Sequence, residues 1–376
     1  MDSEHFSCPF GSYQLHRLPL QKQQPLRAWD AADEYLLSHL HNEQLLTAES
    51  RVLIVNDSFG ALSINLHAYS IQNWSDSFIS HQACRENFQH NQINQLPTLV
   101  QSTDAPQGTF NIVLIKIPKT VALLEDQLIR LKPLITADTR IIGAAMLKHL
   151  PKSAIQLFEK ILGTSHTSLA QKKARLIFSR MDNTSRDLQP PYPKCDTEPT
   201  TQITLCQHAN VFSKDKLDIG TRFFLEQFKK LPQAEKILDL GCGNGLLGIM
   251  AQKQQPQAKL SFIDESYMAV ASARQSYSKS FPDKPADFFA SNVLSQFSGK
   301  VDLVICNPPF HQQHSTGDFI AWQMFVQSQQ SLEKSGELWI VGNRHLNYHS
   351  KLKKLFGSCD FIASNKKFVA LRAQKK

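Results

Sequence analysis

Short apolar runs alternate with amphipathic segments along both halves of the chain. In the second half, the runs that predict strands cover residues 236–240, 259–264, 286–291, 301–306, 337–341 and 367–371. Segments 246–254 and 267–277 carry apolar residues at helical spacing and predict helices. Strands that are apolar throughout and separated by helices are typical of a parallel sheet covered on both faces. Each half is therefore predicted to be a doubly wound, Rossmann-like α/β domain.

The two halves match each other in the same order. Residues 52–64 align with 237–249, 111–118 with 302–309, 140–145 with 338–343, and 173–180 with 366–373. Any two α/β domains would show apolar strands at similar spacing. The shared detail of FGALSI at 59–64 and NGLLGI at 244–249 instead favours an ancient duplication. We therefore predict two tandem domains of one origin.

A segment without periodic apolar residues lies near the middle of the chain. Residues 181–202 contain Pro190, Pro191, Pro193 and Pro199, which oppose helices and inner strands. We place the boundary between 182 and 202, with one domain at 1–190 and another at 200–376. The chain has 376 residues, of which 41% are hydrophobic, enough for two sizeable cores. This composition excludes a largely disordered chain.

Charge and cysteine content limit the class of partner and the cellular compartment that we expect. The 41 Lys and Arg against 33 Asp and Glu give a net charge of +8, which suits an anionic partner such as nucleic acid, although a solvated basic face gives the same balance. The seven cysteines include no CxxC pair, so we expect neither a disulfide framework nor a zinc site, and a reducing compartment. There is no secretory signal at the start and no run near the ~18 apolar residues that span a bilayer. We expect a soluble, cytoplasmic protein.

A glycine-rich turn between a predicted strand and a predicted helix is the first candidate site. Its residues are Asp239, Gly241, Cys242, Gly243, Asn244 and Gly245. The glycines permit a tight turn and the close approach of a ligand, and the helix N-terminus favours a polar or anionic group. Asp264 ends the next strand, where a carboxylate can accept both hydroxyls of a ribose, and Ser291 and Asn292 follow the third strand, where they can border an adenine ring. Helix capping or turn formation is the structural alternative for the two aspartates.

The sharpest signal is Asn307-Pro308-Pro309-Phe310, at the end of the predicted strand 301–306. The prolines fix the backbone and remove amide donors, which leaves the Asn307 amide oxygen and the Pro308 carbonyl oxygen as adjacent acceptors. Two acceptors suit an NH2 group conjugated to a ring or a carbonyl. Holding both hydrogens while the nitrogen becomes tetrahedral aims its lone pair at an electrophile, and Phe310 offers a face for a planar base. A proline-rich turn is the structural alternative.

Together these motifs resemble the S-adenosylmethionine-dependent methyltransferases that modify exocyclic or amide nitrogens through an NPP[FY] motif. Segments 208–226, 237–249, 290–293 and 304–313 are similar to the ribosomal RNA guanine-N2 methyltransferases. Those enzymes are tandem methyltransferase domains, the first of which has lost its cofactor site. Residues 342–357 and 363–371 look most like the large-subunit (23S) enzymes of the RlmG family. The small-subunit (16S) enzymes of the same architecture are the alternative.

The resemblance implies a function and a set of roles. S-adenosylmethionine would be the cofactor, and the N2 amine of a guanine in 23S rRNA would accept the methyl group. Phe212, Asp218 and Gly220 would help to close the cofactor pocket. The partner would be ribosomal RNA, naked or in an assembly intermediate. We expect a monomer without a metal ion and without a membrane.

The first half departs from these motifs. It has Asn56, Asp57 and Ser58 where the second half has residues 241–243, and Lys116-Ile117-Pro118 in place of Asn307-Pro308-Pro309. We predict that it is catalytically silent and serves RNA recognition or support; a purely structural partner is the alternative.

Other functions fit the sequence less well. A glutamine-N5 protein methyltransferase would be expected to carry NPPY and a helical N-terminal domain, and the duplication disfavours a DNA adenine-N6 enzyme. A non-catalytic RNA-binding protein leaves the glycine turn and Asn307-Pro308-Pro309-Phe310 unexplained. His311 and His314 lack cysteine or carboxylate company, which indicates an exposed loop and not a metal site.

Overall fold

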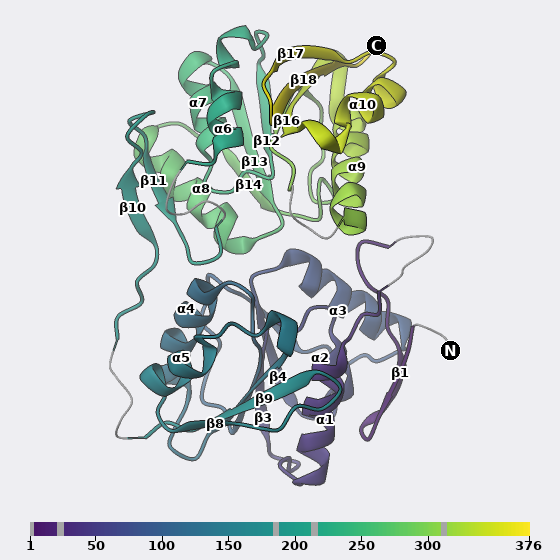
Figure 1. Cartoon of the computed structure of the whole chain (residues 1–376), viewed down its shortest axis with the longest axis vertical. Coiled ribbons are helices and arrows are strands. Elements are labelled where there is room, and N and C mark those ends of the chain that lie inside the picture. The colour runs from purple at the N-terminus through teal and green to yellow at the C-terminus, as the bar shows by residue number, and fades with distance from the viewer. Residues whose placement is uncertain (1–3, 21–25, 183–187, 212–216, 310–313) are drawn as a thin grey trace. The chain divides into compact units, whose positions relative to one another are not determined.

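A computed structural model describes residues 4–20, 26–182, 188–211, 217–309 and 314–376, with the backbone alone for 314–317. The chain divides into two compact units, Met1–Tyr192 and Pro193–Lys376, a division that falls inside segment 182–202 (Figure 1). No helix in the described ranges is both long and apolar enough to cross a membrane.

The first unit begins with a hairpin and continues as alternating strands and helices (Figure 1). Its elements are β1 (His5–Cys8), β2 (Gly11–Gln14), α1 (Ala31–Asn42), β3 (Arg51–Val55), α2 (Ala61–Asn65), β4 (Ser70–Ser75), α3 (Phe78–His90), β5 (Thr98–Gln101), β6 (Ile112–Lys116), α4 (Val121–Leu131), β7 (Arg140–Met146), α5 (Ala154–Ile161), β8 (Ser165–Thr167) and β9 (Ala174–Ser179).

The second unit repeats this plan after a hairpin of its own. Its elements are β10 (Lys194–Thr197), β11 (Thr204–Gln207), α6 (Ile219–Leu225), β12 (Lys236–Leu240), α7 (Leu246–Gln254), β13 (Lys259–Asp264), α8 (Tyr267–Ser280), β14 (Asp287–Ala290), β15 (Val301–Cys306), α9 (His314–Ser331), β16 (Leu332–Asn343), α10 (Tyr348–Phe356), β17 (Asp360–Ser364) and β18 (Phe368–Gln374).

Each unit contains one seven-stranded sheet, and the two sheets have the same strand order. The orders are β5-β4-β3-β6-β7-β9-β8 and β14-β13-β12-β15-β16-β18-β17. The first five strands of each order are parallel, which confirms the predicted doubly wound fold. The sheets are not parallel throughout, because β9 and β18 run antiparallel and pair in turn with the edge strands β8 and β17.

Strand pairing shows which residues of the two sheets correspond. Val52 corresponds to Ile237, as the sequence alignment has it. Arg140 corresponds to Glu337, whereas the alignment set it against Leu338. Two of the four aligned segments, 140–145 and 173–180, are therefore wrong by one residue. Both lie in strands that are buried on both faces, so no alternation of polar and apolar residues marks which side chain faces which way.

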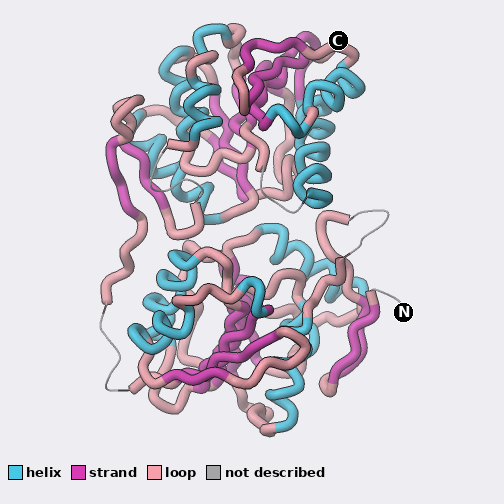
Figure 2. Tube along the Cα trace, viewed as in Figure 1, coloured by secondary structure: helices cyan, strands magenta, loops and turns pink. Residues whose placement is uncertain are grey.

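The sheet of the second unit is covered on both faces (Figure 2). Alternate residues of β12 point to opposite sides, so Ile237 packs with α6, α7 and α8, and Leu238 packs with α9 and α10. Because both faces are covered, a ligand can approach this sheet only at a strand end.

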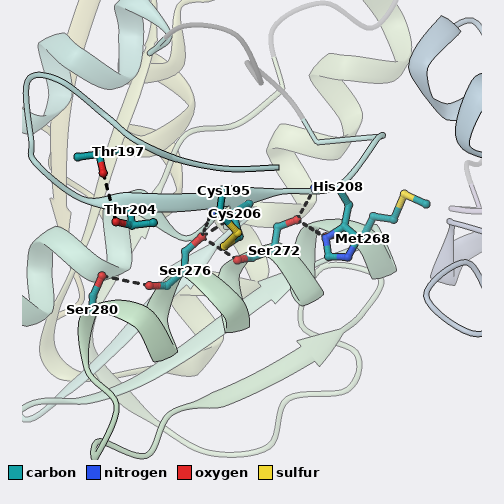
Figure 3. The surroundings of a disulfide bond; sticks show 9 residues. All are labelled: Cys195, Thr197, Thr204, Cys206, His208, Met268, Ser272, Ser276 and Ser280. Carbon is teal, nitrogen blue, oxygen red and sulfur yellow. Dashed lines mark hydrogen bonds between the residues drawn. A yellow bond between two sulfur atoms is a disulfide. The ribbon is translucent and has the colours of Figure 1, made fainter. Parts of the chain in front are cut away.

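The hairpin of β10 and β11 departs from the expectations for the linker and for the cysteines. Residues 194–197 pair antiparallel with 204–207, which sets Cys195 directly opposite Cys206, and the two form a disulfide (Figure 3). The cysteine spacing predicted no disulfide framework, and this single disulfide was missed. Cysteines 11 residues apart give no CxxC signal, but a tight hairpin makes them cross-strand neighbours.

Serines of α8 hold this hairpin against that helix (Figure 3). Ser276 Oγ accepts a hydrogen bond from the Cys206 amide at 2.9 Å, and Ser272 Oγ accepts one from the His208 amide at 3.0 Å. Ser272, Ser276 and Ser280 recur at every fourth position of α8, so they lie on one face of the helix. Their small side chains let β11 lie close to that face.

Candidate active site

Strand register brings the candidate residues of the second unit to one edge of the sheet. Leu240 of β12 pairs with Ile263 on one side and with Cys306 on the other, and Asp264 pairs with Ala290. The segments that begin at Gly241, Asp264, Ser291 and Asn307 therefore leave the sheet at neighbouring points. The chain reverses its direction of strand addition between β12 and β15, and ligands of such folds bind at that switch point.

The glycine turn adopts a backbone that needs glycine. Gly241, Gly243 and Gly245 have φ values of 73°, 54° and 83°, in the left-handed region. A Cβ on Gly245 would lie 3.0 Å from Cα of Ala273, so this glycine allows α7 and α8 to pack closely. A Cβ on Gly243 would meet nothing within 4 Å, so this part of the turn borders open space. Asn244 Oδ1 accepts a hydrogen bond from the amide of Leu246, the first residue of α7, whose N-cap is Gly245.

Asp264 is joined to the turn. Its Oδ2 accepts a hydrogen bond from the Gly243 amide at 3.0 Å, and its Oδ1 accepts one from the Ser266 amide at 3.1 Å. The carboxylate therefore lies beside the open part of the glycine turn. Its role toward a ribose stays a prediction.

Asp239 is fully buried at the end of β12. Its Oδ2 accepts a hydrogen bond from the Gly248 amide at 2.8 Å, and its Oδ1 is buried with no partner among the described residues. Burial raises the pKa of this carboxyl to about 8; the Gly248 amide opposes the shift and the Asp264 charge adds to it. The thiols of Cys242 and Cys306 are buried close by, and burial raises the pKa of each well above its ordinary value. A carboxyl with one unsatisfied oxygen suits a ligand that brings a donor or a positive charge.

The predicted adenine segment forms a turn. Ser291 is buried, its amide donates to the Asp264 carbonyl at 2.9 Å, and its hydroxyl accepts from the Gln296 amide at 3.0 Å. The Asn292 carbonyl accepts from the Ser295 amide, and Asn292 itself is half-buried. The Ser291 hydroxyl thus shapes the turn, while contact of Asn292 with an adenine ring stays a prediction.

Asn307 lies half-buried directly after β15, and Pro308 is buried. Asn307 Nδ2 donates a hydrogen bond to Thr221 Oγ1 at 3.0 Å. Asn307 Oδ1 is buried and has no partner among the described residues. The amide thus has one end satisfied by the protein and one acceptor left over. Phe310 lies outside the described residues.

Two of the three residues assigned by resemblance to the cofactor pocket lie in the described part of the chain. Asp218 is the N-cap of α6 and accepts a hydrogen bond from the Thr221 amide at 2.9 Å. Gly220 is buried, and a Cβ on it would lie 3.0 Å from Asp218 Oδ2 and 3.1 Å from the Phe368 ring. Phe212 lies outside the described residues. Sequence reasoning missed Thr221, because no local pattern marks a contact between residues 86 positions apart.

The corresponding edge of the first unit has other side chains. Asn56 stands at the place of Gly241, with a φ of 64°, and Ser75 stands at the place of Asp264. Lys116 stands at the place of Asn307, and its Nζ lies 2.7 Å from Asp33 Oδ1 and 2.9 Å from Asp30 Oδ1. Burial acts to lower the pKa of Lys116, but attraction to Asp33 and Asp30 outweighs it and raises that pKa. An ion pair therefore fills this edge, where in the second unit the Asn307 amide oxygen has no partner among the described residues.

The Arg130 guanidinium fills a second position of that edge. It donates hydrogen bonds to the carbonyls of Ser102 and Asp104 and lies 4.9 Å from the centre of the Trp74 ring. Ser102 corresponds to Ser291, since the Ser102 amide donates to the Ser75 carbonyl as the Ser291 amide does to that of Asp264. The segment predicted to border an adenine in the second unit is thus bound by the protein's own cation in the first.

No group of three metal-ligating side chains is placed to hold a metal ion in the part of the chain that the structure describes. His311 lies outside that part, and only the backbone of His314 is described.

Comparison with known proteins places the chain in a family. The model described as RLMG N-terminal domain matches residues 3–183, and the Methyltransferase small domain matches residues 202–372. The ribosomal RNA large subunit methyltransferase G of Ectopseudomonas mendocina (strain ymp) is 48% identical over 98% of this chain and 99% of its own length. The chain belongs to the ribosomal RNA large subunit methyltransferase G family. The protein of the same name from Stutzerimonas stutzeri (strain A1501) is also 48% identical, over 98% of each chain.

A solved structure supports the fold. A T. thermophilus 16S rRNA N2 methyltransferase (RsmC), in complex with AdoMet and guanosine, matches with a TM-score of 0.77 over 99% of this chain and 97% of that one. The identity is 16%, so the match concerns the fold alone. Family membership confirms the resemblance drawn from the sequence, and the chain is a methyltransferase of this family.

Proposed function

We propose that this protein transfers a methyl group from S-adenosylmethionine to the exocyclic N2 amine of one guanine in 23S rRNA. The names of the relatives support the large-subunit substrate, since proteins 44–48% identical over almost the whole chain are large subunit rRNA methyltransferases. The observation that carries the chemistry is the Oδ1 of Asn307, which lies beside the glycine turn and is buried with no partner among the residues that the structure describes.

The residues at the sheet edge fit the cofactor. Asp239 Oδ1 is a buried oxygen with no partner in the described ranges, which suits the amino group of the methionine part. Gly243 borders open space, so the backbone of the turn can approach a ligand. Asp264, held beside this turn, would accept the ribose hydroxyls, and Asn292 would border the adenine ring. Phe212, Asp218 and Gly220 keep the proposed role of closing the pocket.

The chain's own part in the reaction is to bind and orient the amine. The cofactor, when bound, supplies a methyl group already activated by its sulfonium. Asn307 Oδ1 and the Pro308 carbonyl oxygen would each accept one hydrogen of the guanine amine, which holds the nitrogen as it becomes tetrahedral. The methylated amine is acidic, so its proton can pass to solvent without a strong general base. Phe310 keeps the proposed role of stacking on the base.

The substrate must expose its guanine. The N2 amine lies in the minor groove of a duplex and cannot enter a recessed pocket while the base is stacked. We therefore propose a loop guanine, or a helix that can open, in naked 23S rRNA or an assembly intermediate. The protein would act as a cytoplasmic monomer without a metal ion.

The domain at 1–190 would be the silent partner of the catalytic domain at 200–376. In the first unit, Lys116 and its two aspartates occupy the place that the guanine amine would take in the second. Arg130, bound to two carbonyls, occupies the place that the adenine would take. This half is left to recognise RNA or to support the catalytic half.

Transfer of tritiated methyl groups tests the proposal. Purified protein would be incubated with 23S rRNA, 16S rRNA or total ribosomal protein, and the product nucleoside would be identified by mass spectrometry. The proposal expects N2-methylguanosine in 23S rRNA and a loss of at least about 100-fold with Asn307→Ala, because one of two acceptors is gone. Label in 16S rRNA alone would favour the small-subunit alternative, and label in protein alone would favour a glutamine enzyme.

A further inference from the structure

An asparagine can serve as an acceptor for an amine only in one of its two orientations. Rotation of the side-chain amide by half a turn exchanges Oδ1 and Nδ2, and Nδ2 would present hydrogens to the hydrogens of the amine. A side chain that selects one orientation therefore contributes to catalysis without touching the substrate. We propose that Thr221 is this positioning residue, an inference that rests on the proposed function.

The order of donors and acceptors along three side chains determines the orientation of the Asn307 amide. The Asp218 carboxylate offers only acceptors, so the Thr221 hydroxyl, 3.3 Å from Asp218 Oδ2, gives its one proton to it. The lone pairs of Thr221 Oγ1 are then left to accept, and Asn307 Nδ2 donates to them at 3.0 Å. With Nδ2 bound in this way, Oδ1 must point away from Thr221.

Thr221 is itself held firmly. Its amide donates to Asp218 Oδ2 at 2.9 Å in the first turn of α6, so the same carboxylate fixes both its backbone and its hydroxyl. The helix is anchored by Phe224, which is fully buried and packs edge-on against Phe228. Threonine has a branched Cβ and few rotamers, so a fixed backbone places its Oγ1.

The first unit supplies an independent comparison within the same chain. Asp30 is the N-cap of α1 as Asp218 is of α6, and α1 contacts β7 and β9 as α6 contacts the corresponding strands β16 and β18. The third residue after the N-cap is Asp33 in one helix and Thr221 in the other. Asp33 binds Lys116, which stands at the place of Asn307.

The two halves thus differ at both residues of the corresponding contact: the one after the strand and the one in the first turn of the helix. Where asparagine follows the strand, the helix offers a hydroxyl that accepts from its amide nitrogen, and the amide oxygen has no partner in the described ranges. Where the strand ends in lysine, the helix offers a carboxylate that neutralises it. The helix position is matched to the strand-end residue in each half, which is expected if its task is to set what that residue presents.

Substitution of Thr221 separates a positioning role from a structural one. Thr221→Val keeps the shape and the backbone amide but removes the acceptor, so Nδ2 loses its hydrogen bond to residue 221 and the amide is free to turn. Loss of one such hydrogen bond corresponds to about 10- to 100-fold in rate. We expect kcat for 23S rRNA methylation to fall by that factor, with KM for RNA and Kd for the cofactor changed less than about twofold.

Two matched variants complete the set. Thr221→Ser keeps the hydroxyl and should restore kcat to within about threefold of the wild type. Thr167→Val makes the same change at an exposed threonine of β8 and should leave kcat unchanged. A wild-type kcat for Thr221→Val, an equal loss for Thr221→Ser, or a loss confined to cofactor affinity would each overturn the inference.

A measurement without substrate tests the orientation of the Asn307 amide separately from the proposed function. In 15N-labelled protein, the side-chain NH2 signal of Asn307, assigned by its absence in Asn307→Ala, should exchange with solvent at least about tenfold more slowly in the wild type than in Thr221→Val. Equal exchange would refute the positioning role even if the wild type methylated nothing. A wild type that is inactive on 23S rRNA but shows slow exchange would refute the proposed function and leave the orientation of Asn307 supported.

Discussion

Binding of the cofactor should release a proton from Asp239. Burial raises the pKa of this carboxyl to about 8 in the ligand-free protein, so it is mostly protonated at neutral pH. The proposed pocket brings a positively charged amino group to Oδ1, which has no partner among the described residues, and a positive charge at hydrogen-bonding distance favours the ionised form. The other titratable groups near it are Asp264, which adds to the shift, and the thiols of Cys242 and Cys306, which stay protonated.

The size of the effect follows from the pKa of Asp239. With a pKa of about 8, about ten molecules are protonated for each one ionised at pH 7, and about a hundred at pH 6. If only the ionised form binds tightly, the apparent Kd for S-adenosylmethionine falls about ninefold between pH 6 and pH 7. Binding at pH 7 then releases about 0.9 proton. An α-amino group is still mainly protonated in this range, so the ligand contributes little to the change.

Isothermal titration calorimetry at pH 6 and pH 7, in buffers of different ionisation enthalpy, measures both quantities. The isosteric variant Asp239→Asn should bind more weakly at pH 7, with no proton release and a Kd that is independent of pH. Without ligand, Asp239→Asn should be more stable than the wild type at pH 8. In the wild type, the raised carboxyl pKa makes the free energy of unfolding fall by up to about 1.4 kcal/mol per pH unit as the pH rises from the pKa of the unfolded state to that of the folded state. Proton uptake, or the same Kd at both pH values in the wild type, would refute this reasoning.

Three further predictions concern other parts of the chain. Lys116→Met should lower the free energy of unfolding by about 3 kcal/mol in urea titrations, because it leaves Asp33 buried without its cation. The double variant Lys116→Asn with Asp33→Thr should recover most of this loss. Equal losses in the single and double variants would contradict this prediction. The double variant Lys353→Gln with Lys354→Gln, on the exposed side of α10, should reduce the slope of log affinity for RNA against log salt by about 1.4 in filter-binding assays. An unchanged slope would show that these lysines face solvent and do not contact phosphates. Thiol titration in denaturant without reductant should count five of the seven cysteines, and a count of seven would contradict the hairpin disulfide.

Much of the fold could be read from the sequence because the strands carry their own signal. Strands β12, β13 and β15 have the predicted bounds, since each is a short, mainly apolar run in which most residues are buried. Strand β17 and the β10–β11 hairpin were missed, because β17 is largely exposed at a sheet edge and β10 is wholly exposed. Such strands depend on their partners more than on their own residues.

The candidate site was predictable only where it is local. The glycine turn and Asn307 are contiguous motifs next to strands, and parallel register brings them to one edge. Thr221 and the unpaired oxygen of Asp239 depend on contacts across the fold and on burial, which a linear pattern does not contain. The hydrogen bond between Asn307 and Thr221 is a case in which the residue types are ordinary and the information lies in their geometry.

The central claim is that the second unit methylates guanine N2 in large-subunit RNA with Asn307 as an acceptor. The most direct measurement maps modified nucleosides in 23S and 16S rRNA from cells that carry the wild-type chain, the Asn307→Ala chain or no copy. We predict one N2-methylguanosine in 23S rRNA that is present with the wild type and lost in the other two. An unchanged 23S map in cells without the protein, or full methylation with Asn307→Ala, would contradict the claim.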